Sequence, residues 1–311
     1  MTDTAPAISI LIVAYNSRDF ICDCIGSVIA HTAPGSYEIL LVDNGTDATA
    51  DLVAATFPSV RIIPGQGNIG FGRGNNLLAE HARGDYLLLL NPDTRLEDPA
   101  IDRLLAFARA QPGAAWGGLT KNPDGELHGN FLPIPTLGTI LREVAGMGGA
   151  LHHDALARQL GDGPRRIEVL TGGYMMVSRE AWQALGGFDE SFLLYSEEVD
   201  LFTRLKKLGG AVWLCPDSQV IHDVGSGDLF SPIRLVFAYT GRMHYARRHW
   251  RGLTVPLIGV GYWLSALRRW LTSMALGPVS ATHRARRRAF TPIILRPWVW
   301  WRGYDGRTSL E

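Results

Sequence analysis

The sequence predicts an α/β fold with a doubly wound, mostly parallel sheet, and three observations lead to this prediction. Short apolar runs alternate with stretches of helical spacing along the first 225 residues. Each run is continuous in its hydrophobicity, which is typical of parallel strands covered by helices on both faces. Polar residues follow directly after the runs, at the sheet edge where ligands bind in such folds.

The strands and helices are expected in a regular order. Apolar runs predict strands over residues 8–13, 38–42, 60–63 and 86–90, and a sheet-like run later over 218–221. Helical spacing predicts helices over residues 17–30, 46–56 and 71–82, and a further helix is expected over 98–106. An acidic segment that starts at Glu197 predicts another helix, with Ser196 as its N-cap.

Charge is divided unevenly along the chain. The 311 residues carry 30 Lys+Arg and 30 Asp+Glu, and this zero balance excludes a disordered tail protein, a collagen-like fibre and a histone-like polycation. Residues 226–311 nevertheless hold 14 arginines against three acids, a balance of +11, together with six of the nine tryptophans. Residues 1–225 therefore carry −11. We expect an acidic domain over residues 1–225 and a basic, Trp-rich helical extension over residues 226–311.

Cysteine usage and the N-terminal residues predict a location in the cell. Three cysteines are too few for a disulfide scaffold, and their spacing matches no four-ligand zinc pattern. No cationic segment precedes the first apolar run, so no signal peptide is expected. These features predict a reducing, cytoplasmic environment.

The segment GQGNIG at residues 65–70 matches the dinucleotide-binding pattern G-x-G-x-x-G. Asp93 closes the next strand about 20 residues later, as that pattern requires. An NAD(P)-dependent oxidoreductase that uses Gly65 to Gly70 as its dinucleotide loop is therefore an alternative function. Two strand–helix units precede this segment, however, whereas the fingerprint normally lies in the first unit of its domain. A flexible turn that binds no ligand is the third possibility.

Asp93 and His222 are candidate metal ligands because each follows a sheet-like run. Pro92 ends the strand before Asp93, which leaves a carboxylate at the functional edge of the sheet. A carboxylate there can hold a divalent cation that neutralises a diphosphate. The residue would otherwise form an Asp-Thr turn or cap the next helix. A lone histidine such as His222 is more commonly a packed or surface residue than a ligand.

Glu197, Glu198 and Asp200 place three carboxylates at the start of one helix. Acids in a first turn are favoured by the helix dipole, which is the usual structural explanation. Crowded carboxylates also raise the pKa of one member, and a carboxylate with a raised pKa is a serviceable general base. The sequence leaves these two explanations open.

Seven segments, taken in this order, give the chain a family resemblance. They are ILIVAYN (10–16), LVDNG (41–45), NIGFGRGNN (68–76), NPD (91–93), TGG (171–173), GGFDE (186–190) and EEVD (197–200). Over residues 7–225 the chain resembles glycosyltransferase family 2, in its rhamnosyltransferase-like branch. The resemblance implies a GT-A fold, which is a Rossmann-like, mixed and mostly parallel sheet with helices on both faces, here followed by a C-terminal helical extension. It also implies an inverting hexosyltransferase that reacts by a single displacement.

The resemblance implies a binding site for the nucleotide-sugar donor. Asp43 would meet the nucleotide base, and Ala14, Tyr15 and Asn16 would line the same pocket. The segment 68–76 would flank the donor, which removes the dinucleotide interpretation of its glycines. The matching residues in that segment are Asn68, Gly70, Phe71 and Asn75.

The resemblance also implies a metal site and a catalytic base. Asn91 and Asp93 occupy the place of the D-x-D metal motif of the family, with Asn instead of the first Asp. His222 would complete the coordination of Mg²⁺ or Mn²⁺. Glu198 matches the catalytic base and Glu197 would help to hold the acceptor hydroxyl, although the family usually has Glu-Asp or Asp-Asp at these two positions.

The expected partners follow from the resemblance and from the basic extension. The donor would be dTDP-rhamnose or a UDP-linked sugar, and the acceptor a saccharide or a polyprenyl-linked saccharide in cell-surface polysaccharide synthesis. Arginine and tryptophan beside apolar helices suit an anionic membrane surface, so a peripheral position on the inner face of the plasma membrane is expected. The 16 uncharged residues from 252 to 267 are too few to span a bilayer. The extension could instead pack on the catalytic domain or form a homodimer through its helices, and no nucleic-acid fold signature favours RNA.

Overall fold

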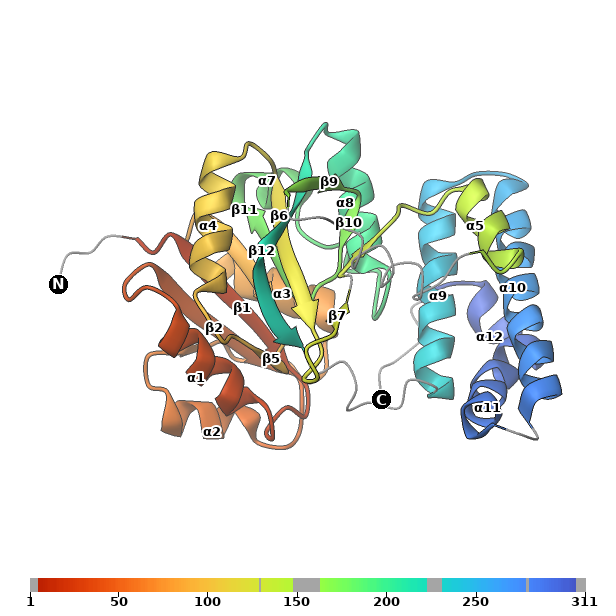
Figure 1. Ribbon diagram of the computed structural model, residues 1–311, viewed down its shortest axis with the longest axis horizontal. Helices are drawn as coiled ribbons and strands as arrows, with labels where there is room; N and C mark the ends of the chain where they lie inside the picture. Colours follow the sequence, from red (N-terminus) through yellow and green to blue (C-terminus); the bar gives the residue numbers. More distant parts are fainter. Residues whose placement is uncertain (1–4, 129, 148–162, 223–230, 278–279, 306–311) are drawn as a thin grey trace.

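The computed structural model describes residues 5–128, 130–147, 163–222, 231–277 and 280–305. A twisted sheet with helices on both faces is followed by a bundle of helices that stands beside it (Figure 1). The predicted fold class is confirmed.

Four parallel strands form one half of the main sheet. They are β1 (Ile8–Ala14), β2 (Tyr37–Asp43), β3 (Arg61–Ile62) and β4 (Tyr86–Leu90), in the order β3-β2-β1-β4. β1 pairs in parallel with both β2 and β4, and β2 with β3. Because consecutive strands of a parallel pair need a crossover, helices lie between them on either face.

The other half of the sheet is mixed. β11 (Tyr174–Ser178) runs antiparallel between β4 and β6 (Ala115–Lys121), and β12 (Val212–His222) lies parallel to β6. Short strands complete the edges: β5 (Thr94–Arg95) and β9 (Arg165–Ile167) pair with β12, and β7 (Leu127–His128) pairs with β6. β8 (Phe131–Leu132) and β10 (Val169–Leu170) form a separate two-stranded sheet.

The alternation of side chains along β1 explains why both faces are covered. Ile10 and Ile12 point into one core and Leu11 into the other, and all three are fully buried. The first core is closed by α1 (Ile21–His31), α2 (Thr49–Thr56) and α4 (Ala100–Ala110). The second is closed by α3 (Phe71–His81), α7 (Arg179–Leu185) and α8 (Glu197–Lys207).

The C-terminal bundle consists of α9 (Pro232–His249), α10 (Thr254–Leu276), α11 (Ala281–Leu295) and the short α12 (Trp298–Trp301). It has a core of its own, with Tyr239, Tyr262 and Trp300 at its centre. α9 lies on the side of the sheet domain, and α10 on the far side (Figure 1). The spacing of apolar residues over 232–250 is helical in the sequence, and α9 forms there. Among the described residues, no helix has the length and hydropathy that crossing a membrane requires.

α10 continues through Pro256 and Gly259, although proline and glycine often interrupt helices. Pro256 lies in the first turn, where its missing N–H has no helical partner to lose. Gly259 allows the ring of Trp301 to pack directly on the helix, because a Cβ there would lie 2.8 Å from that ring.

A helix from the catalytic region joins the bundle. α5 (Leu137–Val144) packs against α10, and its Glu143 lies 3.1 Å from Arg242 and 2.8 Å from Arg269. Burial alone would raise the pKa of Glu143, but the two guanidinium groups lower it to about 2. The bundle therefore includes α5 from before the predicted boundary at residue 225 as well as the helices that follow this boundary.

Candidate active site

The carboxyl ends of β1 and β2 form the first part of the site. The parallel register places Ala14 beside Asp43. Asp43 accepts hydrogen bonds from the backbone N–H of Gly45 at 2.8 Å and of Ala50 at 2.9 Å, which ties the loop after β2 to the start of α2. A Cβ on Gly45 would lie 2.5 Å from the backbone nitrogen of Asn16, so only glycine allows the two loops to meet.

Next to this carboxylate, Tyr15 is 55% exposed. Asn16 adopts a left-handed conformation with φ 48°, and its Oδ1 accepts a hydrogen bond from Thr46 at 3.1 Å. An exposed aromatic ring beside a fixed carboxylate is suited to a nucleotide base, because the ring offers a stacking surface and the carboxylate accepts a hydrogen bond.

The predicted donor segment 68–76 forms the turn into α3. Asn68 accepts a hydrogen bond from Gly70, which has φ 85°, and Asn75 donates to Phe71. The side chains of Asn68 and Asn75 therefore shape this turn. The Oδ1 of Asn75 is buried and has no hydrogen-bond partner in the described part of the chain. The segment also follows β3, an edge strand of two residues, rather than the first strand of the domain. That position speaks against a dinucleotide loop.

The two predicted metal ligands meet at the end of β4. β5 pairs with β12 in such a register that Thr94 faces His222, which brings the neighbouring Asp93 to the same place. The Nε2 atom of His222 lies 3.1 Å from the Oδ1 atom of Asp93 and 3.2 Å from the Nδ2 atom of Asn91. The next residues of the chain, 223–230, lie outside the described part.

Asp93 and His222 fit a divalent cation. The Oδ1 of Asp93 is buried and accepts no hydrogen bond from the described residues, and the Nε2 of His222 lies 3.1 Å away as its charge-compensating neighbour. A cation bound between these two atoms would compensate the buried carboxylate. Divalent transition-metal ions such as Mn²⁺ bind both carboxylate oxygen and imidazole nitrogen. Within the described ranges, no group of three or more His, Cys, Asp or Glu side chains is arranged to hold a metal ion, so Asp93 and His222 form a pair of candidate ligands.

Two consecutive glycines connect the metal pair to the glutamates. Gly173 stands at the start of β11, where its carbonyl accepts from the backbone N–H of Asn91 at 3.1 Å. A Cβ on Gly173 would lie 2.9 Å from the ring of His222. The backbone N–H of Gly172 donates to the Oε1 of Glu198 at 3.1 Å. The segment 171–173 was recognised as a motif in the sequence but received no role, and the structure places it at the centre of the site.

Phe71 closes this part of the site. A Cβ on Gly172 would lie 2.5 Å from the ring of Phe71 and 3.1 Å from the Oε1 of Glu198. The donor segment, the glycine pair and the glutamate therefore converge on one place.

The two glutamates differ in their environment. Glu197 is 3% exposed, and its Oε2 has no hydrogen-bond partner among the described residues. Burial, and secondarily the charge of Glu198, raises the pKa of Glu197 well above its usual value. Glu198 is half-buried. Burial also raises the pKa of Glu198, while its own backbone N–H and that of Gly172 partly oppose this effect.

The turn that delivers these glutamates is strained. Tyr195 and Ser196 both adopt left-handed conformations, with φ 67° and 72°, which are unfavourable for residues other than glycine. Ser196 is the N-cap residue of α8, as predicted, but its side chain makes no capping hydrogen bond. A side-chain cap requires an extended backbone at that residue, and the tertiary packing imposes a different one.

Helix α9 is in direct contact with this turn. A Cβ on Gly241 would lie 2.3 Å from the carbonyl oxygen of Tyr195. Tyr304, which follows α12, donates its hydroxyl to the carbonyl of Leu194. Sequence reasoning missed these contacts, because residues of the basic extension carry no catalytic motif.

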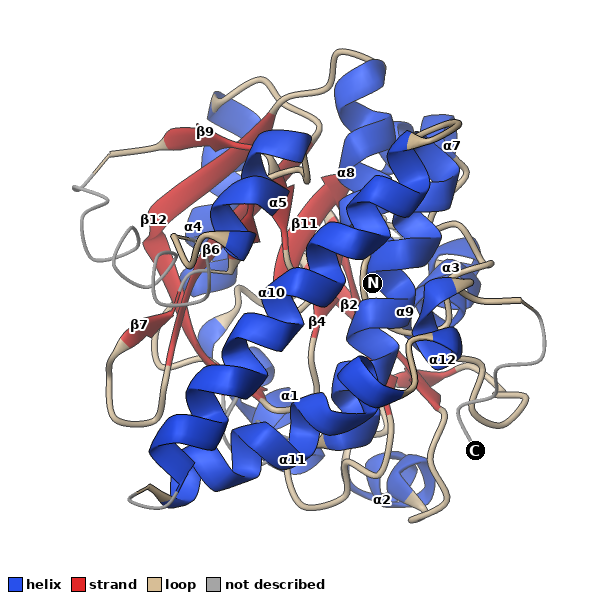
Figure 2. Ribbon diagram, turned by 90° about the vertical axis from the view of Figure 1, so that its right-hand side faces the viewer, coloured by secondary structure: helices blue, strands red, loops and turns tan. Residues whose placement is uncertain are grey.

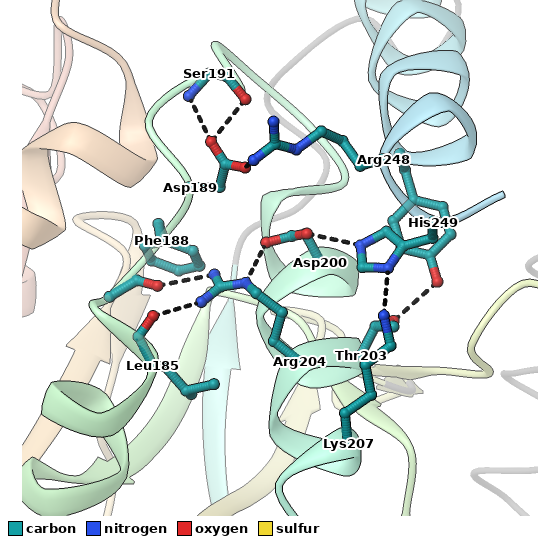
Figure 3. Close-up of polar contacts among 12 residues, drawn as sticks. Leu185, Phe188, Asp189, Ser191, Asp200, Thr203, Arg204, Lys207, Arg248 and His249 are labelled. Carbon is teal, nitrogen blue, oxygen red and sulfur yellow. Dashed lines mark hydrogen bonds and ion pairs between the residues drawn. The ribbon is translucent and has the colours of Figure 1, made fainter. Parts of the chain in front are cut away.

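A polar network extends the contact along α8 and α9 (Figure 3). Asp200 lies 2.7 Å from the Nε2 of His249 and 2.7 Å from the Nε of Arg204. Arg204 in turn donates to the carbonyls of Leu185 and Gly187, each at 2.8 Å. Of the three acids at the start of α8, Asp200 thus has a structural role. A second ion pair joins Asp189 of the GGFDE segment to Arg248.

Two groups of the predicted residues lie along one edge of the sheet. Ala14 to Asn16 and Asp43 lie at the ends of β1 and β2, and the metal pair lies after β4. β1 separates β2 from β4, so Asp43 and the metal pair are roughly 10 Å apart, which is two strand spacings. A nucleoside diphosphate can bridge such a span, with its base at Asp43 and its phosphates near Asp93.

Comparison with known proteins agrees with this geometry. The family model described as Glycosyl transferase family 2 matches residues 9–185. The N-acetylglucosaminyl-diphospho-decaprenol L-rhamnosyltransferase of Mycobacterium tuberculosis (strain ATCC 25618 / H37Rv) is 31% identical over 249 residues, which cover 71% of this chain and 76% of that protein. Rhamnosyltransferase WbbL of Escherichia coli K12 is 23% identical over 225 residues, covering 68% of this chain and 82% of that protein.

Solved structures support the fold. The mannosyltransferase PcManGT from Pyrobaculum calidifontis, in complex with GDP-Man and Mn²⁺, superposes with a TM-score of 0.58 at 17% identity, covering 97% of this chain and 85% of that chain. GalNAc-T7 with UDP, GalNAc and Mn²⁺ gives a TM-score of 0.53 at 18% identity, covering 70% of this chain and 43% of that chain. Together with the family match over more than half of the sequence, the comparisons show that this chain belongs to glycosyl transferase family 2 and is a glycosyltransferase with the GT-A fold.

Proposed function

We propose that this glycosyltransferase moves rhamnose from dTDP-rhamnose, or a related sugar from a UDP-linked donor, onto a polyprenyl-linked saccharide, with inversion. The observation that carries this proposal is the connection of Glu198 to Asp93 and His222 through the glycine pair 172–173. The anomeric carbon of the donor sugar would then lie between the base and the site for the cation that binds the diphosphate. The rhamnosyltransferase names of the relatives support the sugar.

Asp43, with Tyr15 beside it, would hold the nucleotide base. Mg²⁺ or Mn²⁺, bound at Asp93 and His222, would supply positive charge for the departing diphosphate. The two solved structures compared above, which are complexes with Mn²⁺, support this assignment. Asn91 would help to fix the His222 ring through their 3.2 Å contact.

Glu198 would act as the base. Its carboxylate would take the proton of an acceptor hydroxyl while that oxygen attacks the anomeric carbon, and the bond to the diphosphate would break with its electron pair leaving on the diphosphate. The raised pKa of Glu198 favours proton uptake. The backbone N–H of Gly172 would keep the carboxylate oriented. Glu197 is 3% exposed, and we assign it a supporting role beneath the acceptor rather than the role of base.

The test uses the full chain and a panel of nucleotide sugars. We expect thermal stabilisation and transfer with dTDP-rhamnose or a UDP-sugar, on an acceptor such as polyprenyl-diphosphate-N-acetylglucosamine, and loss of transfer when EDTA removes divalent metal. Glu198→Gln should abolish transfer and keep donor binding. Stabilisation by NAD and by none of the nucleotide sugars would contradict the proposal.

A further inference from the structure

The outer side of the C-terminal bundle carries a stripe of apolar side chains that the described residues leave exposed. The stripe comprises Leu253, Leu257, Val260, Leu264, Leu271 and Met274, with exposed fractions between 40% and 81%. Leu253 is the N-cap residue of α10 and the other five lie within the helix. Their spacing places them on about one third of the helix circumference. α10 runs across the side of the molecule that is remote from the sheet (Figure 2). A soluble monomer rarely exposes so continuous an apolar surface unless the surface has a partner.

A groove next to the stripe is rich in tryptophan. It has a volume of about 410 Å³ and lies between α10 and α12, lined by Val260, Trp263, Pro297, Trp298, Trp301 and Arg302. Trp298 is 65% exposed. Tryptophan with an apolar body and one N–H donor prefers the boundary between hydrocarbon and headgroups.

The charge around this face selects the partner. α10, α11 and α12 contain no Asp or Glu, and the exposed charged residues on or beside them include Arg251, Arg287, Arg288, Arg296 and Arg302. A second copy of this chain, packed face to face through these helices, would bring the cations against each other, and the three helices supply no acid to compensate them. A surface of anionic lipid headgroups complements both the arginines and the apolar stripe.

We propose that the face formed by the α10 stripe and the Trp298 groove docks the protein on an anionic bilayer. α10 lies along the surface with its leucines among the upper acyl chains, and the arginines contact lipid phosphates. The attachment is peripheral. Membrane docking deepens the proposed function, because a polyprenyl-linked acceptor is presented at the same membrane surface. The purpose of docking therefore rests on that proposed function.

The experiment measures co-sedimentation of the full chain with vesicles and uses no sugar nucleotide. We expect binding to vesicles of half phosphatidylglycerol and half phosphatidylcholine, weaker binding at high salt, and no binding to pure phosphatidylcholine. Leu257→Glu and Trp298→Glu alter residues that are 64% and 65% exposed, so the fold should persist. Each should weaken vesicle binding at least about tenfold. Leu208→Glu, at a residue 62% exposed on the catalytic domain, is the matched control and should bind like the wild type.

Three results would overturn the proposal. The first is absence of binding by the wild type, and the second is equal binding by Leu257→Glu and the wild type. The third is a lipid-free dimer that Leu257→Glu dissociates, which would assign this face to a second copy. Transfer to a water-soluble acceptor is measured in parallel. If vesicle binding fails while this transfer persists, only the docking proposal fails; if the transfer fails while vesicle binding persists, only the proposed function fails.

Discussion

The contact between α9 and the glutamate-bearing turn gives a prediction for Gly241→Ala. A Cβ at residue 241 would lie 2.3 Å from the carbonyl oxygen of Tyr195, so the turn must move by about 1 Å to reach ordinary contact distance. Tyr195 lies three residues before Glu198, and a displacement of about 1 Å at a catalytic group can cost about 100-fold in rate. We expect kcat to fall by about 100-fold, or about 2.7 kcal/mol in the barrier, with an unchanged donor Kd because Asp43 and Asp93 are on other elements.

The assay compares kcat for transfer with donor Kd, and circular dichroism checks the fold. Gly26→Ala in α1 is the matched control, because a Cβ there meets nothing within 4 Å. Overpacking at residue 241 costs about 1–3 kcal/mol of stability, which a folded domain can tolerate. If Gly241→Ala is folded and keeps kcat within about twofold of the wild type, α9 does not position the base.

Three further predictions concern single carboxylates and the metal pair. Activity should fall as pH falls through the raised pKa of Glu198, with a midpoint above 4.5, and a pH–rate profile of kcat checks this. The Glu197→Gln variant should keep the same pH–rate profile. If the pH dependence disappears in Glu197→Gln, Glu197 is the base. His222→Ala should raise the Mn²⁺ concentration needed for half-maximal activity at least about tenfold, as a metal titration would show, whereas an unchanged titration would remove His222 from the site. The pKa of Glu143 is lowered from 4.5 to about 2, so this group should contribute about 3 kcal/mol of stability that is present above pH 4.5 and lost as pH falls toward 2. Urea unfolding should show that Glu143→Gln has a lower free energy of unfolding than the wild type at about pH 7. The difference between the two proteins should shrink in acid.

The sequence predicted those elements whose pattern is local. The strands that end at Ala14, Asp43 and Leu90 were found because continuous apolar runs mark buried parallel strands. Boundaries were less well predicted: α1 begins at Ile21 rather than at residue 17, and β12 begins at Val212, well before the run at 218–221. The antiparallel insertion of β11 has no local signal, since strand direction depends on the path of the chain between strands.

The sequence by itself determined the fold class, the family and the identity of the polar residues at the strand ends. Only the tertiary structure decided which of these residues meet. The pairing of β5 with β12 brings Asp93 to His222 across 129 positions of sequence, and antiparallel β11 delivers Gly172 to Glu198. The tertiary structure also showed that the basic extension packs against the turn before Glu197 through Gly241 and Tyr304. The charge pattern of the sequence had separated this extension from the rest of the chain. The physical reason is that residue type and periodicity are local properties, whereas long-range pairing and close packing depend on the whole folded chain.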